Sequence, residues 1–118
     1  MKKKKILIVD DDRFLTESIS DILKLKGYDI EMAYDGIEAV GMMSSGRDDI
    51  DCILMDIKMP EMDGVTALKK ILALKPGMDI IMMTGYSIDE LIDEAWANGA
   101  REVLNKPFDI ERFVELIG

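Results

Sequence analysis

The stretch "ILIVDDDRF", Ile6 to Phe14, places four consecutive apolar residues directly before three consecutive carboxylates. A short apolar run bounded by charged residues is typical of a buried strand in a parallel sheet. The aspartates that follow have two interpretations: a solvated run of charge, or a site that requires concentrated negative charge at the end of a buried strand. The rest of the sequence distinguishes the two.

Four further apolar runs, each bounded by glycine, proline or aspartate, predict further strands. They are Ile30–Ala33, Ile53–Met55, Ile80–Met83 and Val103–Leu104. The segments between them carry apolar residues three and four positions apart, which line one face of a helix. These residues are Leu15, Ile19, Ile22 and Leu23; Val65, Leu68, Ile71 and Leu72; Ile88, Leu91, Ile92, Ala95 and Trp96; and Ile110, Phe113, Val114 and Ile117. A weaker helix is predicted over Ile37 to Ser45.

Strand and helix therefore alternate five times along the chain. This alternation predicts an α/β fold with a parallel sheet, helices on both faces and right-handed crossovers. Gly27 and Gly99 fall just after predicted helices, where a left-handed cap favours glycine. No linker, repeat or low-complexity segment divides the 118 residues, so we expect one domain, residues 1–118.

Composition and charge exclude several classes of function. A formal net charge of −9 argues against direct binding of nucleic acid, and we interpret the basic run Lys2–Lys5 as a solubilising tail. No apolar run approaches the ~20 residues that span a bilayer, and the run after the lysines is too short for an export signal. The lone Cys52 cannot form an internal disulfide, which favours a cytoplasmic location. The chain has no histidine, so catalysis by histidine and metal sites with histidine ligands are excluded.

Polar side chains follow four of the predicted strands at the point where each strand ends. They are Asp10–Asp12, Asp56, Thr84 and Lys106. The carboxyl ends of parallel strands meet at one edge of a sheet, where open α/β sheets bind their ligands. Two unit charges ~4 Å apart repel by about 4 kcal/mol at an effective dielectric near 20. We therefore expect a compensating cation, either Lys106 or a metal.

An oxygen-only donor set favours a hard cation such as Mg²⁺, which shares its coordination shell with phosphate oxygens. In such a site the carboxylate of Asp56 could attack phosphorus as a nucleophile. Lys106 would offset charge on the phosphoryl group, and the hydroxyl of Thr84 could donate a hydrogen bond to it. The pattern indicates phosphoryl chemistry.

The motifs "IVDDD", "LMDIKMPEMDG", "MMTG" and "NKPF", in this order and over nearly the whole chain, resemble the receiver domain of two-component response regulators, of the chemotaxis-receiver type. The resemblance implies a flavodoxin-like (βα)₅ doubly wound sheet with strand order 2-1-3-4-5. It also implies a cis bond between Lys106 and Pro107.

By the same resemblance Asp56 is the phosphoacceptor, and Asp10, Asp11, Asp56 and the backbone carbonyl of Lys58 bind Mg²⁺. Thr84 and Lys106 are then the two residues that sense the phosphoryl group. The implied donor is a histidine kinase or a histidine phosphotransfer protein, and the implied response is a change in contacts with an output domain or effector protein. Such a chain is a signalling phosphoacceptor, not an enzyme, and catalyses only its own phosphotransfer and dephosphorylation.

Two positions bear on how the signal is passed on. Receivers commonly carry tyrosine or phenylalanine three residues before the lysine, and this chain has Val103 there. Tyr86, two residues after Thr84, either covers the site or is an ordinary loop residue. The sequence leaves open whether the chain is a free-standing receiver or part of a longer regulator.

The remaining candidates have structural interpretations. Asp12 is expected to begin a helix, Asp63-Gly64 to form a turn before the third helix, and Cys52 to fill the core. The ten methionines, Met82-Met83 among them, are read as core residues. The carboxylates of Glu90, Asp93 and Glu94 are read as solvated charge.

Two other functions compete with that of a receiver. Asp10 and Asp12 have the Asp-x-Asp spacing of phosphatases similar to the haloacid dehalogenase superfamily, where they would be nucleophile and general acid. Three features count against this reading. Phe14 stands where those phosphatases have threonine or valine, no acidic pair follows the fourth strand, and the chain is short. A pseudo-receiver that binds partners without phosphorylation is the other rival, and the complete set of site residues argues against it.

Overall fold

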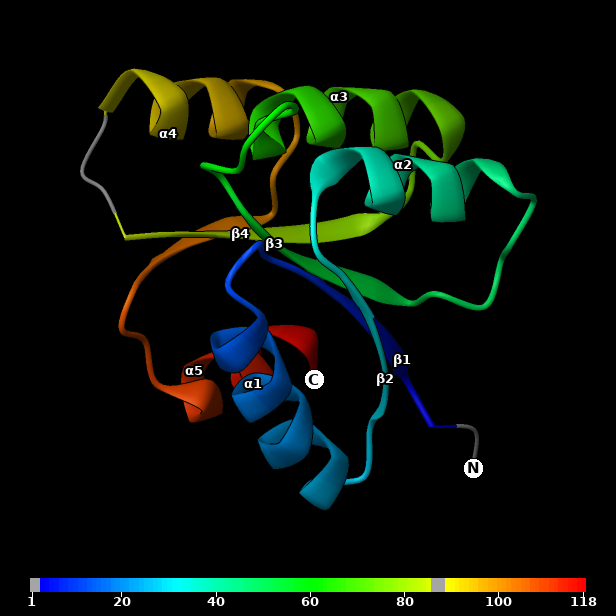
Figure 1. Ribbon diagram of the computed structural model, residues 1–118, viewed down its shortest axis with the longest axis vertical. Coiled ribbons are helices and arrows are strands. Elements are labelled where there is room, and N and C mark those ends of the chain that lie inside the picture. The colour runs from blue at the N-terminus through cyan, green and yellow to red at the C-terminus, as the bar shows by residue number, and fades with distance from the viewer. Residues whose placement is uncertain (1–2, 86–88) are drawn as a thin grey trace.

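A computed structural model describes residues 3–85 and 89–118 as a parallel sheet between two layers of helices (Figure 1). The strands are β1 (Lys5–Val9), β2 (Asp29–Ala33), β3 (Cys52–Asp56), β4 (Asp79–Thr84) and β5 (Glu102–Asn105). The helices are α1 (Arg13–Leu25), α2 (Gly36–Ser44), α3 (Gly64–Leu74), α4 (Asp89–Ala97) and α5 (Ile110–Ile117). The strand order is β2-β1-β3-β4-β5, so the predicted flavodoxin-like (βα)₅ fold and its strand order are confirmed.

The two faces of the sheet carry separate apolar cores. Helices α1 and α5 cover one face, and α2, α3 and α4 cover the other (Figure 1). The core under α1 and α5 is built largely from isoleucine, leucine and phenylalanine, and it includes Cys52, as predicted. The core under the other three helices contains four fully or nearly fully buried methionines: Met43, Met55, Met59 and Met82. Ile22 and Trp96 share the helical spacing of core residues but are 42% and 46% exposed, because each lies at the margin of its helix's apolar face.

The register of the strands decides where their polar ends lie. Val9 pairs with Met55 across β1 and β3, and Asp56 pairs with Met83 across β3 and β4. Asp10, the residue after β1, is therefore nearly level with Asp56 on the neighbouring strand. Strands in a sheet lie ~4.8 Å apart, so this register alone brings the two carboxylates together.

Aspartate caps begin four of the helices. The side chain of Asp12 accepts a hydrogen bond from the backbone of Leu15, and that of Asp63 accepts one from Thr66. Asp35 and Asp109 cap α2 and α5 in the same way. The helix-start roles predicted for Asp12 and Asp63 are confirmed, because each satisfies an amide that the first turn leaves without a partner.

Three further expectations can be compared with the backbone. Gly27 and Gly99 have φ of 99° and 104°, as predicted for glycines that follow helices. The bond between Lys106 and Pro107 is cis, as the family resemblance implied.

Tyr86 and Ile88 lie outside the described residues, so the predictions for them stay predictions. Within residues 3–85 and 89–118, no helix is long and apolar enough to cross a membrane.

Candidate functional site

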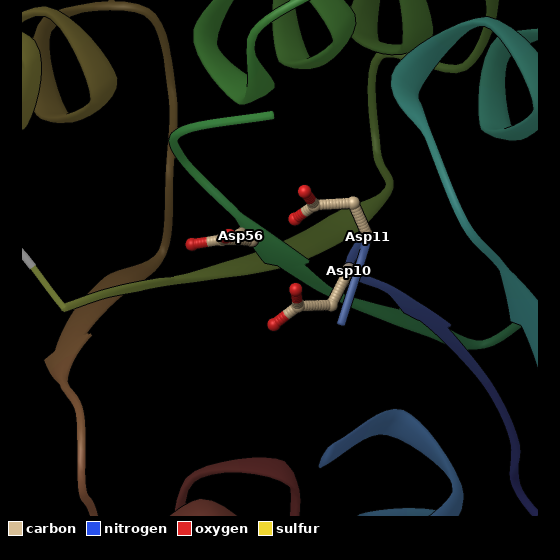
Figure 2. Close-up of side chains that lie close together, drawn as sticks. All are labelled: Asp10, Asp11 and Asp56. Carbon is tan, nitrogen blue, oxygen red and sulfur yellow. The ribbon is translucent and has the colours of Figure 1, made fainter. Parts of the chain in front are cut away.

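Three carboxylates meet at the carboxyl edge of the sheet. Asp10 and Asp11 follow β1, Asp56 ends β3, and one oxygen from each lies within 4.8 Å of the others (Figure 2). Asp10 and Asp56 are 1% and 6% exposed, whereas Asp11 is exposed. The predicted acidic cluster is therefore present, with two buried members and one that faces solvent.

Backbone and side-chain donors fix the orientation of Asp10. The amide of Asp10 donates to the carbonyl of Ala33, at 3.2 Å, and the amide of Asp12 donates to Oδ1 of Asp10, at 2.9 Å. The ammonium of Lys106 donates to Oδ2 of Asp10, at 2.6 Å. Both oxygens of Asp10 therefore have a partner already.

Lys106 supplies the positive charge that the cluster requires. Its Nζ lies 2.6 Å from Asp10 and 3.4 Å from Oδ1 of Asp56, so it bridges the two buried carboxylates. Burial lowers the pKa of Lys106, but the hydrogen bond to Asp10 and the charges of Asp56 and Asp10 outweigh burial and raise the pKa above its usual value. The ammonium is thus charged in the folded protein, as its predicted role requires.

The acidic residues are under electrostatic strain even with this lysine present. Burial, together with the charge of Asp10, raises the pKa of Asp56 from 3.8 to about 6, although Lys106 opposes the shift. Burial and the charge of Asp10 also raise the pKa of Asp11. A further cation at this edge would relieve the repulsion.

The loop between β3 and α3 forms one wall of an open cavity of about 610 Å³ over the cluster. Lys58, Met59 and Pro60 from this loop line the cavity together with Asp10, Asp11, Asp12, Asp56, Gly85 and Lys106. The prediction that the Lys58 carbonyl binds metal stays a prediction. The donor set fits a hard cation, because the clustered ligands are all carboxylate oxygens and the cavity opens to solvent.

Close backbone packing holds this loop. The amide of Gly64 donates to the carbonyl of Ile57, at 2.6 Å, and the amide of Ile57 donates to the carbonyl of Met83, at 2.9 Å. A Cβ at Gly64 would overlap the carbonyl oxygen of Asp56. The sequence identified Asp63-Gly64 only as a turn, whereas the structure adds that no side chain fits beside the backbone of Asp56.

Thr84 and Val103 lie on the strands next to the cluster. Thr84 ends β4 and is 3% exposed, and its carbonyl accepts a hydrogen bond from the amide of Lys106, at 2.7 Å. Val103 pairs with Met82 and packs, partly buried, against the methionine-containing core.

The sequence offered Lys106 as one of two candidate cations for the acidic cluster, but it did not predict that the ammonium of Lys106 donates directly to Asp10. No local signal carries this pairing, because the two residues are 96 positions apart and meet only through the loop orientations after β1 and β5. The cavity-lining role of Met59 and Pro60 was also missed, and their place directly after the Asp56 strand was the available signal.

Comparisons with known proteins give one consistent result. The sequence model of the response regulator receiver domain matches residues 6–118. The chemotaxis protein CheY of Treponema pallidum is 34% identical over 114 residues, which cover 96% of this chain and 79% of that protein. The transcriptional regulatory protein ZraR of Salmonella typhimurium is 38% identical over 113 residues, but the chain spans only 25% of its length. The crystal structure of a CheY-like receiver domain protein from Methanospirillum hungatei matches with a TM-score of 0.92 and 35% identity, over 98% of this chain and 91% of that one.

Proposed function

The chain belongs to the response regulator receiver domain family, and on that premise we propose that Asp56 is the residue that accepts the phosphoryl group. Receiver domains are signalling phosphoacceptors of two-component systems and not classical enzymes. The observation that carries the proposal is the difference between the two buried carboxylates. Both oxygens of Asp10 already have hydrogen-bond donors, whereas Asp56 ends the central strand with Lys106 beside it, 3.4 Å away.

In the proposed reaction an oxygen of Asp56 attacks the phosphorus of a phosphohistidine. A P–O bond forms, the P–N bond breaks, and the departing imidazole nitrogen takes a proton from solvent. The ammonium of Lys106 balances charge on the phosphoryl oxygens, and the hydroxyl of Thr84 donates a hydrogen bond to one of them. Both residues adjoin the cluster, which supports these roles. The later hydrolysis of the acyl phosphate uses water and returns Asp56 to its carboxylate.

Receiver domains bind Mg²⁺ at an acidic pocket, and we assign that role here to Asp10, Asp11 and Asp56, with the carbonyl of Lys58 as a further ligand. The cluster geometry and the raised pKa of Asp11 and Asp56 support the assignment, because each favours an added cation. When bound, the ion would offset negative charge on the phosphoryl group as it is transferred.

The rival phosphatase function would make Asp10 the nucleophile and Asp12 the general acid. The carboxylate of Asp12 instead caps α1, and that of Asp10 is held by two donors. These contacts favour Asp56 over Asp10 as the residue that reacts.

The partners follow from the family at a general level only. We propose that a histidine kinase or a histidine phosphotransfer protein supplies the phosphoryl group, and that an output domain or effector protein responds. A cytoplasmic location fits these partners and the single cysteine of the chain.

Intact mass after incubation with Mg²⁺ and a small acyl phosphate tests the proposal. We expect one phosphoryl adduct on the wild-type protein and none on Asp56→Asn. Asp10→Asn, which keeps the size of Asp10 but replaces one of its two acceptor oxygens with a donor, is the matched control and should still form adduct, more slowly. An adduct that survives in Asp56→Asn but is lost in Asp10→Asn would assign the chemistry to Asp10 and overturn the proposal.

A further inference from the structure

The loop that follows Asp56 contains a turn that is unusual for a residue with a side chain. The amide of Met62 donates to the carbonyl of Pro60, at 2.8 Å, across the single residue Glu61. Glu61 has φ of 66°, which lies in the left-handed region. A hydrogen bond between residues two apart with positive φ at the centre is a classic γ-turn, a rare and strained conformation. The surroundings must therefore hold this turn in place.

One neighbour that holds the turn is Gly36, the first residue of α2. Gly36 is buried, and a Cβ added to it would lie 2.9 Å from the carbonyl oxygen of Met62 and 3.2 Å from its Cγ. The nearest atom belongs to backbone, so it cannot move aside as a side chain could. Helix α2 lies beside α3 on one face of the sheet, with its first turn toward the loop that precedes α3 (Figure 1).

The turn held by Gly36 adjoins the wall of the acidic cavity. Pro60, which accepts the γ-turn hydrogen bond, lines that cavity with Met59 and Lys58. The bond from Gly64 to Ile57 closes the other end of the same loop. A shift of Met62 is therefore passed over a few backbone bonds to the residues beside Asp56.

We propose that Gly36 is a positioning residue for the metal-binding site: by lacking a side chain, it lets α2 seat against Met62 and fix the loop from Lys58 to Met62 over the acidic cluster. The inference rests on the proposed function, since it concerns affinity for Mg²⁺ at that cluster. It assigns a role in the site to a helix that contributes none of the candidate ligands.

The chain offers a matched control on the same helix. Gly41 also lies in α2, but a Cβ there would meet nothing within 4 Å. Gly36→Ala and Gly41→Ala add the same methyl group to the same helix. Alanine is the better helix former, so neither variant weakens α2 by its helix propensity.

Titration of ¹⁵N-labelled protein with Mg²⁺, followed through the amides of Asp10, Asp11 and Asp56, tests the proposal. We expect Gly36→Ala to weaken Mg²⁺ binding roughly tenfold, as loss of a group that orients metal ligands typically does. Gly41→Ala should bind as the wild type does. Equal affinity for Gly36→Ala and wild type, or equal weakening in both variants, would overturn the proposal.

The γ-turn gives a second, independent measurement. Glycine at position 61 relaxes the strained turn, so the loop can yield to the added methyl group. Gly36→Ala should therefore cost less affinity in a Glu61→Gly background than in the wild type, and the charge lost with Glu61 cancels in this comparison. An unchanged cost would show that Gly36 does not act through the turn.

A wild-type measurement covers the case in which Gly36→Ala does not fold. The amides of Gly36 and Met62 should shift with the same Mg²⁺ midpoint as that of Asp11, while the amide of Gly41 stays in place. No shift at Gly36 would contradict the proposal. A wild-type protein in which Mg²⁺ shifts no amide of the acidic cluster would overturn the metal site itself, and the role of Gly36 with it.

Discussion

The two faces of the sheet are packed with different kinds of side chain. Under α1 and α5 the core is isoleucine, leucine and phenylalanine, with Met83 as its one buried methionine among the described residues. Under α2, α3 and α4 the core also contains isoleucine, leucine and valine, but it adds four buried methionines and five small alanines: Ala33, Ala39, Ala67, Ala95 and Ala100. Methionine is unbranched and adapts to irregular gaps, whereas branched and aromatic side chains pack in few conformations. The α2, α3 and α4 face is therefore expected to adjust its packing more readily than the other.

Adjacent residues on β3 allow the most direct test of this contrast. Leu54 and Met55 are both 0% exposed but point to opposite cores. Truncation of either side chain should cost about 2–5 kcal/mol of unfolding free energy, with the smaller cost where the surroundings collapse more fully. We expect Leu54→Ala near the upper limit and Met55→Ala near the lower, measured by urea denaturation. Equal costs would mean that the two cores are equally rigid.

The acidic cluster lies at the carboxyl edge of the sheet, and the cost of its charge to the unfolding free energy is predicted to depend on pH. The pKa of Asp56 rises from 3.8 to about 6 on folding because of burial and the charge of Asp10. The folded protein therefore binds this proton more tightly than the unfolded chain, and without metal the unfolding free energy should fall as pH rises from 3.8 to about 6. At neutral pH the penalty amounts to up to about 3 kcal/mol for a shift of this size.

Asp56→Asn should remove that penalty. The variant is expected to unfold at higher urea concentration than the wild type at pH 7, and the difference should vanish near pH 3. Denaturation at a series of pH values in the presence of a chelator measures it. A wild-type protein whose stability does not change between pH 4 and 6 would contradict the burial of charge at Asp56.

Bound Mg²⁺ should also offset the repulsion among the carboxylates of the cluster. At a hundredfold excess over its dissociation constant, Mg²⁺ is expected to add about 2.7 kcal/mol to the unfolding free energy. Thermal unfolding with and without Mg²⁺ measures the gain, and Ca²⁺ at the same ionic strength tests whether the site distinguishes between two hard cations. No rise in melting temperature at millimolar Mg²⁺ would argue against the assignment of Asp10, Asp11 and Asp56 as ligands.

A smaller effect is expected on the α1 face of the sheet. Ser20 lies in α1, is 1% exposed, and its hydroxyl has no hydrogen-bond partner within the described part of the chain. A buried hydroxyl without a partner is costly, so Ser20→Ala should add about 1 kcal/mol to the unfolding free energy. Ser18→Ala is the control, because the hydroxyl of Ser18 is exposed and bonded to the carbonyl of Phe14. A destabilised Ser20→Ala would reveal a partner for this hydroxyl.

Features that depend on local sequence could be predicted. The apolar run Ile6–Val9 predicted β1, and the position of Asp12 before a helical pattern predicted its helix-start role. Asp63-Gly64 was predicted as the turn that starts the third helix, where the structure adds the cap by Asp63. The meeting of Asp10, Asp11 and Asp56 followed from the rule that parallel strands end at one edge. The strand order came from the family resemblance, since periodicity does not decide which strands are neighbours.

Features that depend on side-chain geometry across the fold could not be predicted. The hydrogen bond from Lys106 to Asp10 and the close approach of Gly36 to Met62 each join distant segments whose contact is set by packing. The γ-turn at Glu61 is local, but no glycine marks its left-handed residue in the sequence.

The split of methionines between the two cores likewise depends on packing across the fold. Five of the ten methionines lie in a core as predicted, and three more, Met42, Met62 and Met78, pack partly buried against one. Met32 belongs to neither core, and Met1 lies outside the described residues.

The ion pair between Lys106 and Asp10 also affects when the domain can become competent during folding. It joins the loop after the first strand to the loop after the last, 96 residues apart. Contacts of such high sequence separation form only when most of the chain is already in place, because the entropy of closing the loop must be met first. A nascent or partly unfolded chain that lacks β5 would hold Asp10 and Asp56 without their lysine. Under the proposed function, efficient phosphorylation of Asp56 is therefore expected to require that β5 has already joined the sheet.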